Sequence, residues 1–296
     1  SAGLRGNYYN TFNRFYLEPR VNLSWLLFNP LQLTASGEYR TQHISQIKES
    51  VVSDLSLENQ VWKLASKERF PIIESYQVTS GLVYRKSGWF LEVEGYYKSI
   101  EGVTSLTFGF LNPVDNDYRT GNSTVKGLDA FLKKQWGYYK SWVSYSYLNT
   151  QNTFIGLNND EPFPGNWNIR HLVNWSHFYT VGQLHLSVGW NWHTGKSYTQ
   201  ISQSEEPAGG PISIGYDQLN GQNLPVYHRL DFSALYEFEG SKSMRYRVGL
   251  SILNVYNRKN ILNREFRTTP SLDNDLIDTR IYSLGITPNL VVRVFW

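Results

Sequence analysis

The sequence predicts an all-β fold, a transmembrane antiparallel up-and-down β-barrel, from three observations. About eleven segments alternate apolar and polar residues with the period of two that gives a strand one face of each kind. Aromatic residues make up 16% of the chain, while the mean hydropathy is only -0.42. The last alternating segment, 284–296, ends on Trp296. Outer-membrane barrels combine these features because their strands turn apolar residues to lipid and polar residues to the lumen.

The composition excludes several other classes of protein. The longest apolar run, 25–28, is far shorter than the roughly 20 residues that a membrane-spanning helix needs. The net charge of +3 comes without a basic run in the sequence, which argues against nucleic acid as a partner. The chain contains no Cys, so disulfide and thiolate chemistry are excluded. A soluble β-sandwich or propeller explains the alternation equally well but the aromatic content less well.

The eleven expected strands alternate between short turns and long connections. Barrels of this class have short periplasmic turns and long extracellular loops, which sets the orientation that we expect. Aromatic residues beside the short turns would form an interfacial girdle: Trp89, Trp136, Tyr138 and Tyr139. The strands are expected at 17–27, 31–39, 78–84, 89–97, 128–133, 143–147, 170–180, 183–193, 230–236, 246–252 and 284–296. The long connections are expected at about 43–74, 99–123, 150–168, 195–225 and 258–280.

Two hairpins allow a prediction of register. If Val181 and Gly182 form a two-residue turn, Thr180 pairs with Gln183 and Trp175 lies opposite Val188. Apolar residues then share one face and polar residues the other, as cross-strand pairing requires. By the same reasoning, Tyr236 pairs with Tyr246.

The strand count bears on whether the barrel is complete. A single-chain bacterial barrel has an even number of strands and both termini in the periplasm. With eleven strands and Trp296 on the short-turn side, the first strand would begin on the long-loop side. We therefore expect residues 1–296 to be the C-terminal part of a larger barrel. A strand missed within 43–74, or before Phe12, would raise the count to twelve.

Seven segments in order resemble the C-terminal half of TonB-dependent outer-membrane transporters, in the style of Bacteroidota. The resemblance runs from about Phe15 to Trp296 and rests on 16–21 (YLEPRV), 125–129 (VKGLD), 170–171 (RH), 193–199 (HTGKSYT), 228–232 (HRLDF), 253–260 (LNVYNRKN) and the terminal aromatic strand. The resemblance implies a barrel of 22 strands, an N-terminal plug inside it and a short segment that recruits a TonB-type energy transducer. The plug and this segment have no counterpart in the sequence.

The function implied by the resemblance is active import of a scarce solute across the bacterial outer membrane. Siderophore, vitamin, peptide and saccharide importers share such a wall, so the solute stays open. The implied partners are outer-membrane lipid, the N-terminal barrel half and plug, the TonB-type transducer and the barrel-assembly machinery, for which Trp296 would be the signal. Long decorations typical of glycan importers are absent, which argues against that subfamily, but a surface lipoprotein stays among the partners to test. Two alternatives are a non-transporting scaffold of a larger assembly and a 12-strand autotransporter-type pore.

Candidate binding residues fall in two groups. Aromatic side chains in the long loops could contact an amphipathic ligand or simply close over a plug: Phe110, Tyr118, Trp167 and Tyr198. Basic residues on the inward face could contact a plug or belong to a salt-bridged lumen wall: Arg20, Arg170, Arg229 and Arg247.

We expect no enzyme, no metal site and no cofactor. No nucleophile elbow, phosphate loop or zinc helix is present. His185 and His193 would share a face but lie about 27 Å apart along a strand, while His171 and His177 face the other way. The segment 115–121 (DNDYRTG) matches a calcium loop only in part, since it lacks the fifth-position ligand and the closing Glu.

Overall fold

The computed structural model describes residues 1–49, 61–107, 117–204, 213–216, 218–240, 244–268 and 276–296. Most of these residues belong to one large, mainly antiparallel sheet whose neighbours follow the chain. Twelve strands lie on its path within the described residues. In order they are β1 (Ala2–Tyr9), β2 (Arg14–Phe28), β3 (Leu31–Gln42), β6 (Ile73–Lys86), β7 (Trp89–Thr107), β8 (Asp117–Trp136), β9 (Tyr139–Phe154), β11 (His171–Val181), β12 (Leu184–His193), β17 (Tyr227–Glu239), β18 (Arg245–Leu253) and β21 (Thr287–Phe295).

The eleven expected strands are all present, and β1 adds a twelfth at the edge of the sheet. The odd count, and with it the expected start on the long-loop side, is therefore wrong. Ala2 pairs with Val21 halfway along β2, and β1 then runs toward the end of the sheet opposite the short turns. This strand was not predicted from the sequence because its alternating segment is short and contains few large apolar residues.

The two sides of the sheet differ sharply in polarity. One side, the apolar face, carries Leu23, Leu82, Leu91, Leu132 and Val143 in neighbouring strands. The opposite side, the polar face, carries Arg20, Glu38, Glu94, Asp129 and Asn191. Large hydrophobic side chains stay exposed along the apolar face, as a lipid-facing sheet requires and a water-soluble one avoids.

Within the described residues, no helix is long and apolar enough to cross a membrane. The described segments contain two single-turn 3-10 helices, η1 (Asn10–Phe12) and η2 (Asn158–Asp160).

Both predicted hairpin registers are wrong by two residues, yet every face assignment holds. Trp175 lies opposite Trp190, and Tyr236 lies opposite Val248. The β11–β12 turn is formed by Gly182 and Gln183, and Gly182 takes the positive φ of 56° that such a turn needs and glycine adopts without strain. Side chains alternate with a period of two, so a two-residue shift moves no side chain to the other face.

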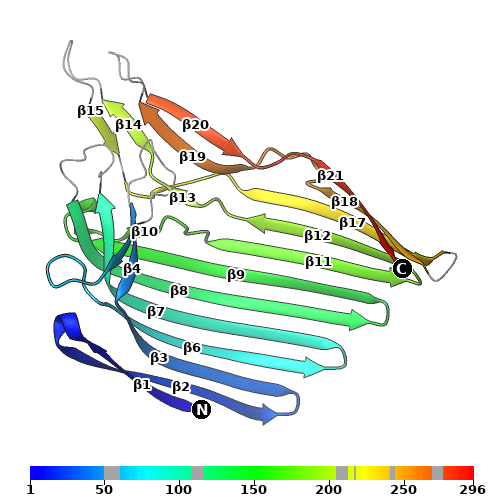
Figure 1. Ribbon diagram of the computed structural model, residues 1–296, viewed down its shortest axis with the longest axis horizontal. Coiled ribbons are helices and arrows are strands. Elements are labelled where there is room, and N and C mark those ends of the chain that lie inside the picture. The colour runs from blue at the N-terminus through cyan, green and yellow to red at the C-terminus, as the bar shows by residue number, and fades with distance from the viewer. Residues whose placement is uncertain (50–60, 108–116, 205–212, 217, 241–243, 269–275) are drawn as a thin grey trace.

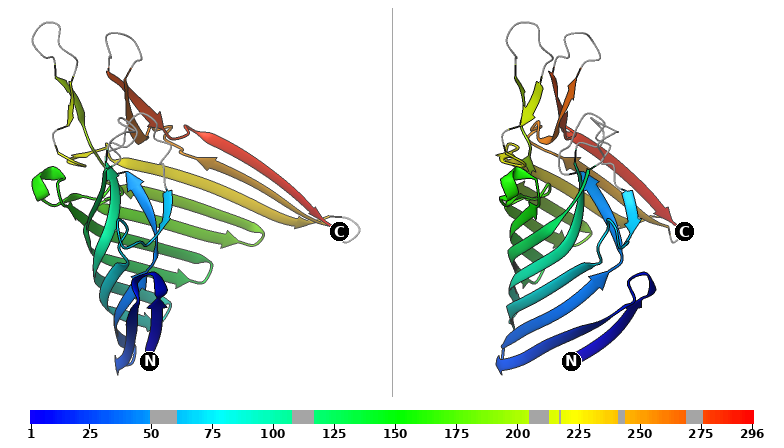
Figure 2. Two further views of the ribbon diagram at one scale, coloured as in Figure 1. Left: turned by 60° about the vertical axis from the view of Figure 1, so that its left-hand side comes forward. Right: turned by 90° about the vertical axis from the view of Figure 1, so that its left-hand side faces the viewer.

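The sheet forms a curved wall whose edges do not meet. Figure 1 shows the long tilted strands joined by short turns at one end, and the views of Figure 2 show the curvature, with the β1–β2 hairpin at one edge and β21 at the other. Ser1 bonds to Asn22, so among the described residues nothing pairs with the outer side of β2 over residues 23–28.

The long connections build a structured rim at the opposite end of the wall. We call the described parts of 43–72, 101–124, 150–170, 194–226 and 254–286 the rim. Figure 1 shows its short strands rising above the sheet. Besides the upper ends of β7, β8 and β9, it contains β4 (Ile44–Glu49), β5 (Val61–Leu64), β10 (Phe163–Pro164), β13 (Ser197–Tyr198), β14 (Ile201–Ser204), β15 (Ser213–Tyr216), β16 (Gln222–Asn223), β19 (Ile261–Thr268) and β20 (Leu276–Tyr282).

The aromatic residues expected beside the short turns lie close to one another there. The rings of Trp89 and Trp136 meet edge-to-face at 6.1 Å, and Trp136 stacks on Tyr139 at 5.5 Å. Tyr138 is strongly exposed beside them. Such amphipathic rings suit the boundary between lipid and water.

Candidate functional site

The rim contains a small hydrophobic core of its own. Phe154 at the end of β9, Leu157, Phe163 and Leu219 are buried together, and Val103 packs against them. Phe163 and Leu219 are fully buried at 0% exposure. Three connections far apart in the sequence, 101–107, 154–163 and 218–221, are therefore held together by apolar contacts.

A buried amide completes this junction. Asn220 donates from Nδ2 to the carbonyl oxygen of Pro164 and to Oδ1 of Asn166, both at 2.8 Å. Its backbone N–H donates to Oγ1 of Thr199 at 3.0 Å. Because a buried amide without partners is costly, these bonds specify one arrangement of the two connections. The rim surface above the wall is thus largely preorganised.

A second junction joins the connection after β12 to the β19–β20 hairpin. Arg264 holds both carboxylate oxygens of Asp278 at 2.8 Å and donates to the hydroxyl of Tyr198 at 2.5 Å. Its guanidinium also lies 5.0 Å from the ring of Phe266. The hydrogen bonds from Arg264 lower the pKa of Asp278, and the same bonds raise the pKa of Arg264.

The structure places three of the four predicted loop aromatics, since Phe110 lies outside the described residues. Tyr118 packs edge-on against Phe70 at 5.1 Å. Tyr198 belongs to the Arg264 junction. Trp167 remains 52% exposed, with the ammonium of Lys196 at 4.5 Å over its ring. Each of these three rings therefore has a different partner, and no contact between any two of them is seen in the described residues.

The four basic residues predicted for the inward face have different surroundings. Arg229 pairs with Asp231 at 2.8 Å, and Arg247 pairs with Glu237 at 2.7 Å. Arg20 lies opposite Glu38 in the β2–β3 ladder. Arg170 is exposed at the foot of the rim, just before β11. Two of the four are therefore neutralised within the wall itself.

Sequence reasoning missed a cavity of about 350 Å³ at the rim, beneath the tip of the β1–β2 hairpin. Arg14, Lys67 and Arg69 bring positive charge to it, and Glu68 and Glu74 bring negative charge. Aromatic side chains supply much of the apolar lining: Phe12, Tyr16 and Phe70. The paired cations and aromatics at 12–16 and 67–70 could have signalled it, but the two segments are far apart in the sequence and only the fold brings them together.

A buried carboxylate anchors the hairpin above this part of the wall. Glu18 is 2% exposed and accepts hydrogen bonds from Asn7 at 2.7 Å and from the backbone and hydroxyl of Thr41 at 2.8 and 2.7 Å. The regular β2–β3 ladder ends at Arg20. Glu18 thus satisfies a β3 backbone N–H near the point where that ladder ends.

The histidines and acidic residues do not converge in the described part of the chain. No group of three or more His, Asp or Glu side chains there could hold a metal ion. His171 and His177 lie on the apolar face, and His185 and His193 on the polar face, as predicted. Of the partial calcium-loop pattern at 115–121, residues 115 and 116 fall outside the described residues, and 117–121 belong to β8.

Comparison with known proteins gives a likeness in structure alone. No protein-family model and no curated protein matches the sequence. The ferric yersiniabactin uptake receptor FyuA from Yersinia pestis is 12% identical, with a TM-score of 0.61 over 96% of this chain and 38% of that one. The FrpB iron transporter from Neisseria meningitidis is 12% identical, with a TM-score of 0.60 over 95% of this chain and 39% of that one.

The copper transporter OprC gives a similar result, 12% identity and a TM-score of 0.59 over 95% of this chain and 40% of that one. The chain therefore spans about two fifths of the length of the structures that it matches. At this identity the likeness shows the fold. The chain has the strand arrangement of part of an outer-membrane transporter barrel.

Proposed function

We propose that this chain forms wall and extracellular rim of a TonB-dependent importer in the bacterial outer membrane. The observation that carries the proposal is the wall itself. Its twelve-strand path, with one apolar and one polar face, follows the barrel of iron, siderophore and copper transporters over 95–99% of the chain. The rim faces outside and the short turns face the periplasm in this proposal.

The open edges of the sheet support a larger barrel. β1 and β21 stand at the two ends of the strand path, and in the described part of the chain no strand pairs with the outer side of either one. In a bilayer the unpaired backbone groups of an open sheet edge have no water to bond, so such an edge does not persist there. Further strands, from the same or another polypeptide, would close the barrel, and a plug in its lumen would contact Arg20, Arg170, Arg229 and Arg247.

The preorganised rim supports a role in solute capture. Its separate loops are held by the Phe163 core and by the Arg264 junction, and the cavity beneath the β1–β2 hairpin lies at another part of the rim. We assign first contact with the solute to this cavity and to the rim aromatics Tyr118, Trp167 and Tyr198, together with Phe110, which lies outside the described residues. Cationic and aromatic groups side by side suit an anionic or aromatic solute.

Energised uptake tests the proposal. A strain that lacks the complete gene is compared with a complemented strain for uptake of ⁵⁵Fe-citrate, ⁵⁵Fe-loaded siderophores, ⁶⁴Cu and labelled cobalamin, with and without a protonophore. We expect protonophore-sensitive uptake of one probe in the complemented strain only. Uptake that is identical in both strains, together with partner proteins that co-purify in fixed stoichiometry, would favour the scaffold function instead.

A further inference from the structure

Two neighbouring short turns concentrate positive charge that the linear sequence does not reveal. The β6–β7 turn and the β8–β9 turn bring together Arg85, Lys86, Lys133, Lys134 and Lys140. No Asp or Glu occurs within 75–91 or 130–154. By contrast, the β11–β12 turn at 180–184 has no charged residue, and the β17–β18 connection mixes both signs. The end of the wall formed by β6 to β9 is therefore uniquely basic among these turns.

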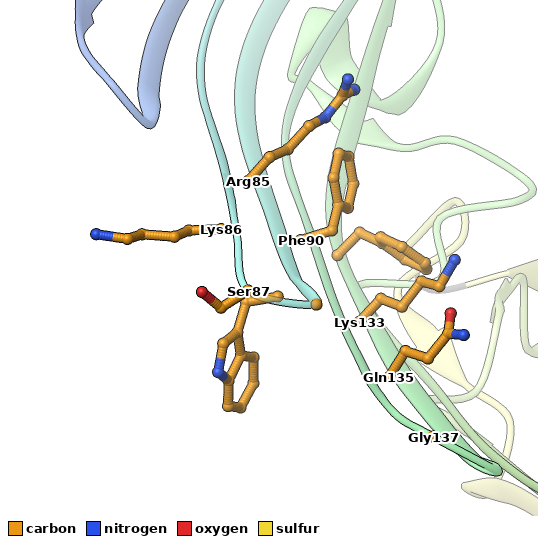
Figure 3. A pocket seen from close by; sticks show the side chains of 10 residues that line it. Arg85, Lys86, Ser87, Phe90, Lys133, Gln135 and Gly137 are labelled. Carbon is orange, nitrogen blue, oxygen red and sulfur yellow. The ribbon is translucent and has the colours of Figure 1, made fainter.

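The strand register divides this charge between the two faces. Lys86 lies opposite Trp89, and Trp89 lies opposite Lys134, so the three form one row on the apolar face. Arg85 and Lys133 flank Phe90 in the row behind it, on the polar face. Figure 3 shows Lys86 pointing to the opposite side from Arg85 and Lys133.

Lys134, one of the two lysines of this row, is held in place by aromatic rings. The ammonium of Lys134 lies 4.6 Å from the ring centre of Trp89 and 5.4 Å from that of Trp136. It also donates a hydrogen bond to the carbonyl oxygen of Ser87 at 2.9 Å. Cation–π contacts and this bond keep the charge at the end of the strand, beside the turn.

A second lysine on the same strand marks the other boundary of the apolar band. Lys126 lies on the apolar face of β8, with its ammonium 5.8 Å from the ring centre of Tyr97. Eight residues separate it from Lys134. At about 3.3 Å per residue and a tilt of about 40°, this corresponds to a height of roughly 20 Å, close to the ~25 Å apolar band of a membrane barrel. Lys134 and Lys86 thus lie at headgroup depth.

We propose that the row Lys86–Trp89–Lys134 binds the phosphate of an anionic phospholipid in the leaflet on the short-turn side. The row lies on the lipid-facing side, so its ligand comes from the membrane. Its two ammonium groups have no Asp or Glu beside them on the apolar face, since the nearest carboxylate along the strand, Glu92, lies on the polar face, and they favour a net negative headgroup over a zwitterionic one. The inference follows from the barrel fold and does not depend on import, since a scaffold barrel would share the site.

A cavity on the other face supplies the competing outcome. It measures about 890 Å³, and Arg85, Phe90, Phe131, Lys133 and Gln135 line it on the polar face, while Lys86 and Trp89 also border it at the β6–β7 turn. An acidic polypeptide segment in the lumen would be neutralised there by Arg85 and Lys133, whose side chains lie on the polar face, rather than by Lys134. Variants of adjacent residues that point to opposite faces therefore distinguish the two ligands.

Lipid retention measured by native mass spectrometry tests the proposal. The complete polypeptide is purified in a neutral detergent and titrated with phosphatidylglycerol or phosphatidylcholine. We expect preferential retention of phosphatidylglycerol by the wild type. The preference should fall about fivefold for each lysine removed, or roughly 25-fold in K86Q/K134Q. The control K126Q, at the other boundary of the same face, and the control R85Q/K133Q, on the opposite face, should each retain most of it.

Any of the following three results would overturn the proposal. Loss in R85Q/K133Q but not in K86Q/K134Q would assign the anion to the lumen cavity. Equal loss in K126Q would leave only general charge attraction. Full competition by inorganic phosphate would mean a free-anion site without lipid specificity. Far-ultraviolet circular dichroism checks that each variant folds, and K86R/K134R should restore retention because the charge returns without the original side chain.

Discussion

The rim of this molecule buries its large apolar side chains, whereas the wall exposes them on one face. In the rim, Phe163 is 0% exposed inside a core formed by three connections, as in a water-soluble protein. In the wall, Leu290 on β21 lies on the apolar face of the sheet, opposite Leu250, and is 70% exposed. The rim supplies its own apolar environment, whereas the wall needs one from outside.

This difference indicates that the rim is suited to water, whereas the apolar face of the wall is suited to an apolar environment. The rim should obey the rules of protein cores, where loss of volume is costly. The wall should obey the rules of a bilayer, where a charge on the apolar face is costly and the volume of a side chain matters less. The effects of substitutions in the two regions should therefore be detected by different assays.

The largest effect is expected for Phe163→Ala in the rim. Removal of a fully buried ring should cost about 3–5 kcal/mol and release the connections that meet there. Hydrogen exchange at 155–170 and 218–226 should rise strongly, while exchange in the wall strands β3, β6, β11 and β12 stays unchanged. The control Ile155→Ala, 75% exposed in the same connection, should change little. Uniform unfolding of wall and rim would mean that they are one cooperative unit.

A charge in the middle of the apolar face should be the next most costly change. Val93 lies opposite Ala130, halfway between the rows of Lys126 and Lys134. Val93→Arg should destabilise the barrel by about 2–4 kcal/mol in a bilayer. Urea unfolding in phospholipid vesicles measures this loss. Ser144→Arg, on the polar face of β9, is the matched control and should cost far less; equal costs would contradict the assignment of faces.

A smaller effect is expected at the turn that sets the β11–β12 register. Gly182 has a φ of 56°, so Gly182→Ala should cost about 1–2 kcal/mol of unfolding free energy. Cross-linking of cysteines placed at positions 175 and 190 should still succeed, since these residues lie opposite each other. Efficient cross-linking between positions 175 and 188 instead would support the register that the sequence alone predicted.

The smallest effect is expected from acid at the Arg264 junction of the rim. The pKa of Asp278 is lowered by the hydrogen bonds from Arg264, so its unfolded value, about 3.9, lies above the folded one. The stabilisation is thus complete above the unfolded value and is lost as the pH falls through the folded value. The loss should not exceed about 1 kcal/mol at this half-exposed site.

Hydrogen exchange of the β19–β20 hairpin from pH 6 to pH 3, corrected for the intrinsic pH dependence, measures this loss. Asp278→Asn should show faster exchange at pH 6 and no further change on acidification. A wild type whose hairpin protection is constant down to pH 3 would contradict the importance of the ion pair. The Phe163 core serves as the internal control because it contains no titrating group.

The alternation of the strands was sufficient to predict the wall and its two faces. Every one of the eleven expected strands is present. An alternation with a period of two is a local property of the sequence, and a sheet with one apolar and one polar face requires it in each strand. Register was predicted less well, since shifting Trp175 from Val188 to Trp190 leaves both faces unchanged. The face pattern cannot distinguish registers that differ by two residues; the turn at Gly182 does.

The rim shows what only the tertiary structure decided. From the sequence, Tyr198 and Phe163 were both aromatic residues in long connections, but one is joined to Arg264 and the other forms the centre of a core. Their partners come from connections far along the chain, and no local period brings them together. The sequence by itself therefore determined the strands and their faces, through short-range alternation. The tertiary structure decided the registers, the edge strand β1, the rim junctions and the basic row, because each depends on contacts between residues that are distant in the sequence.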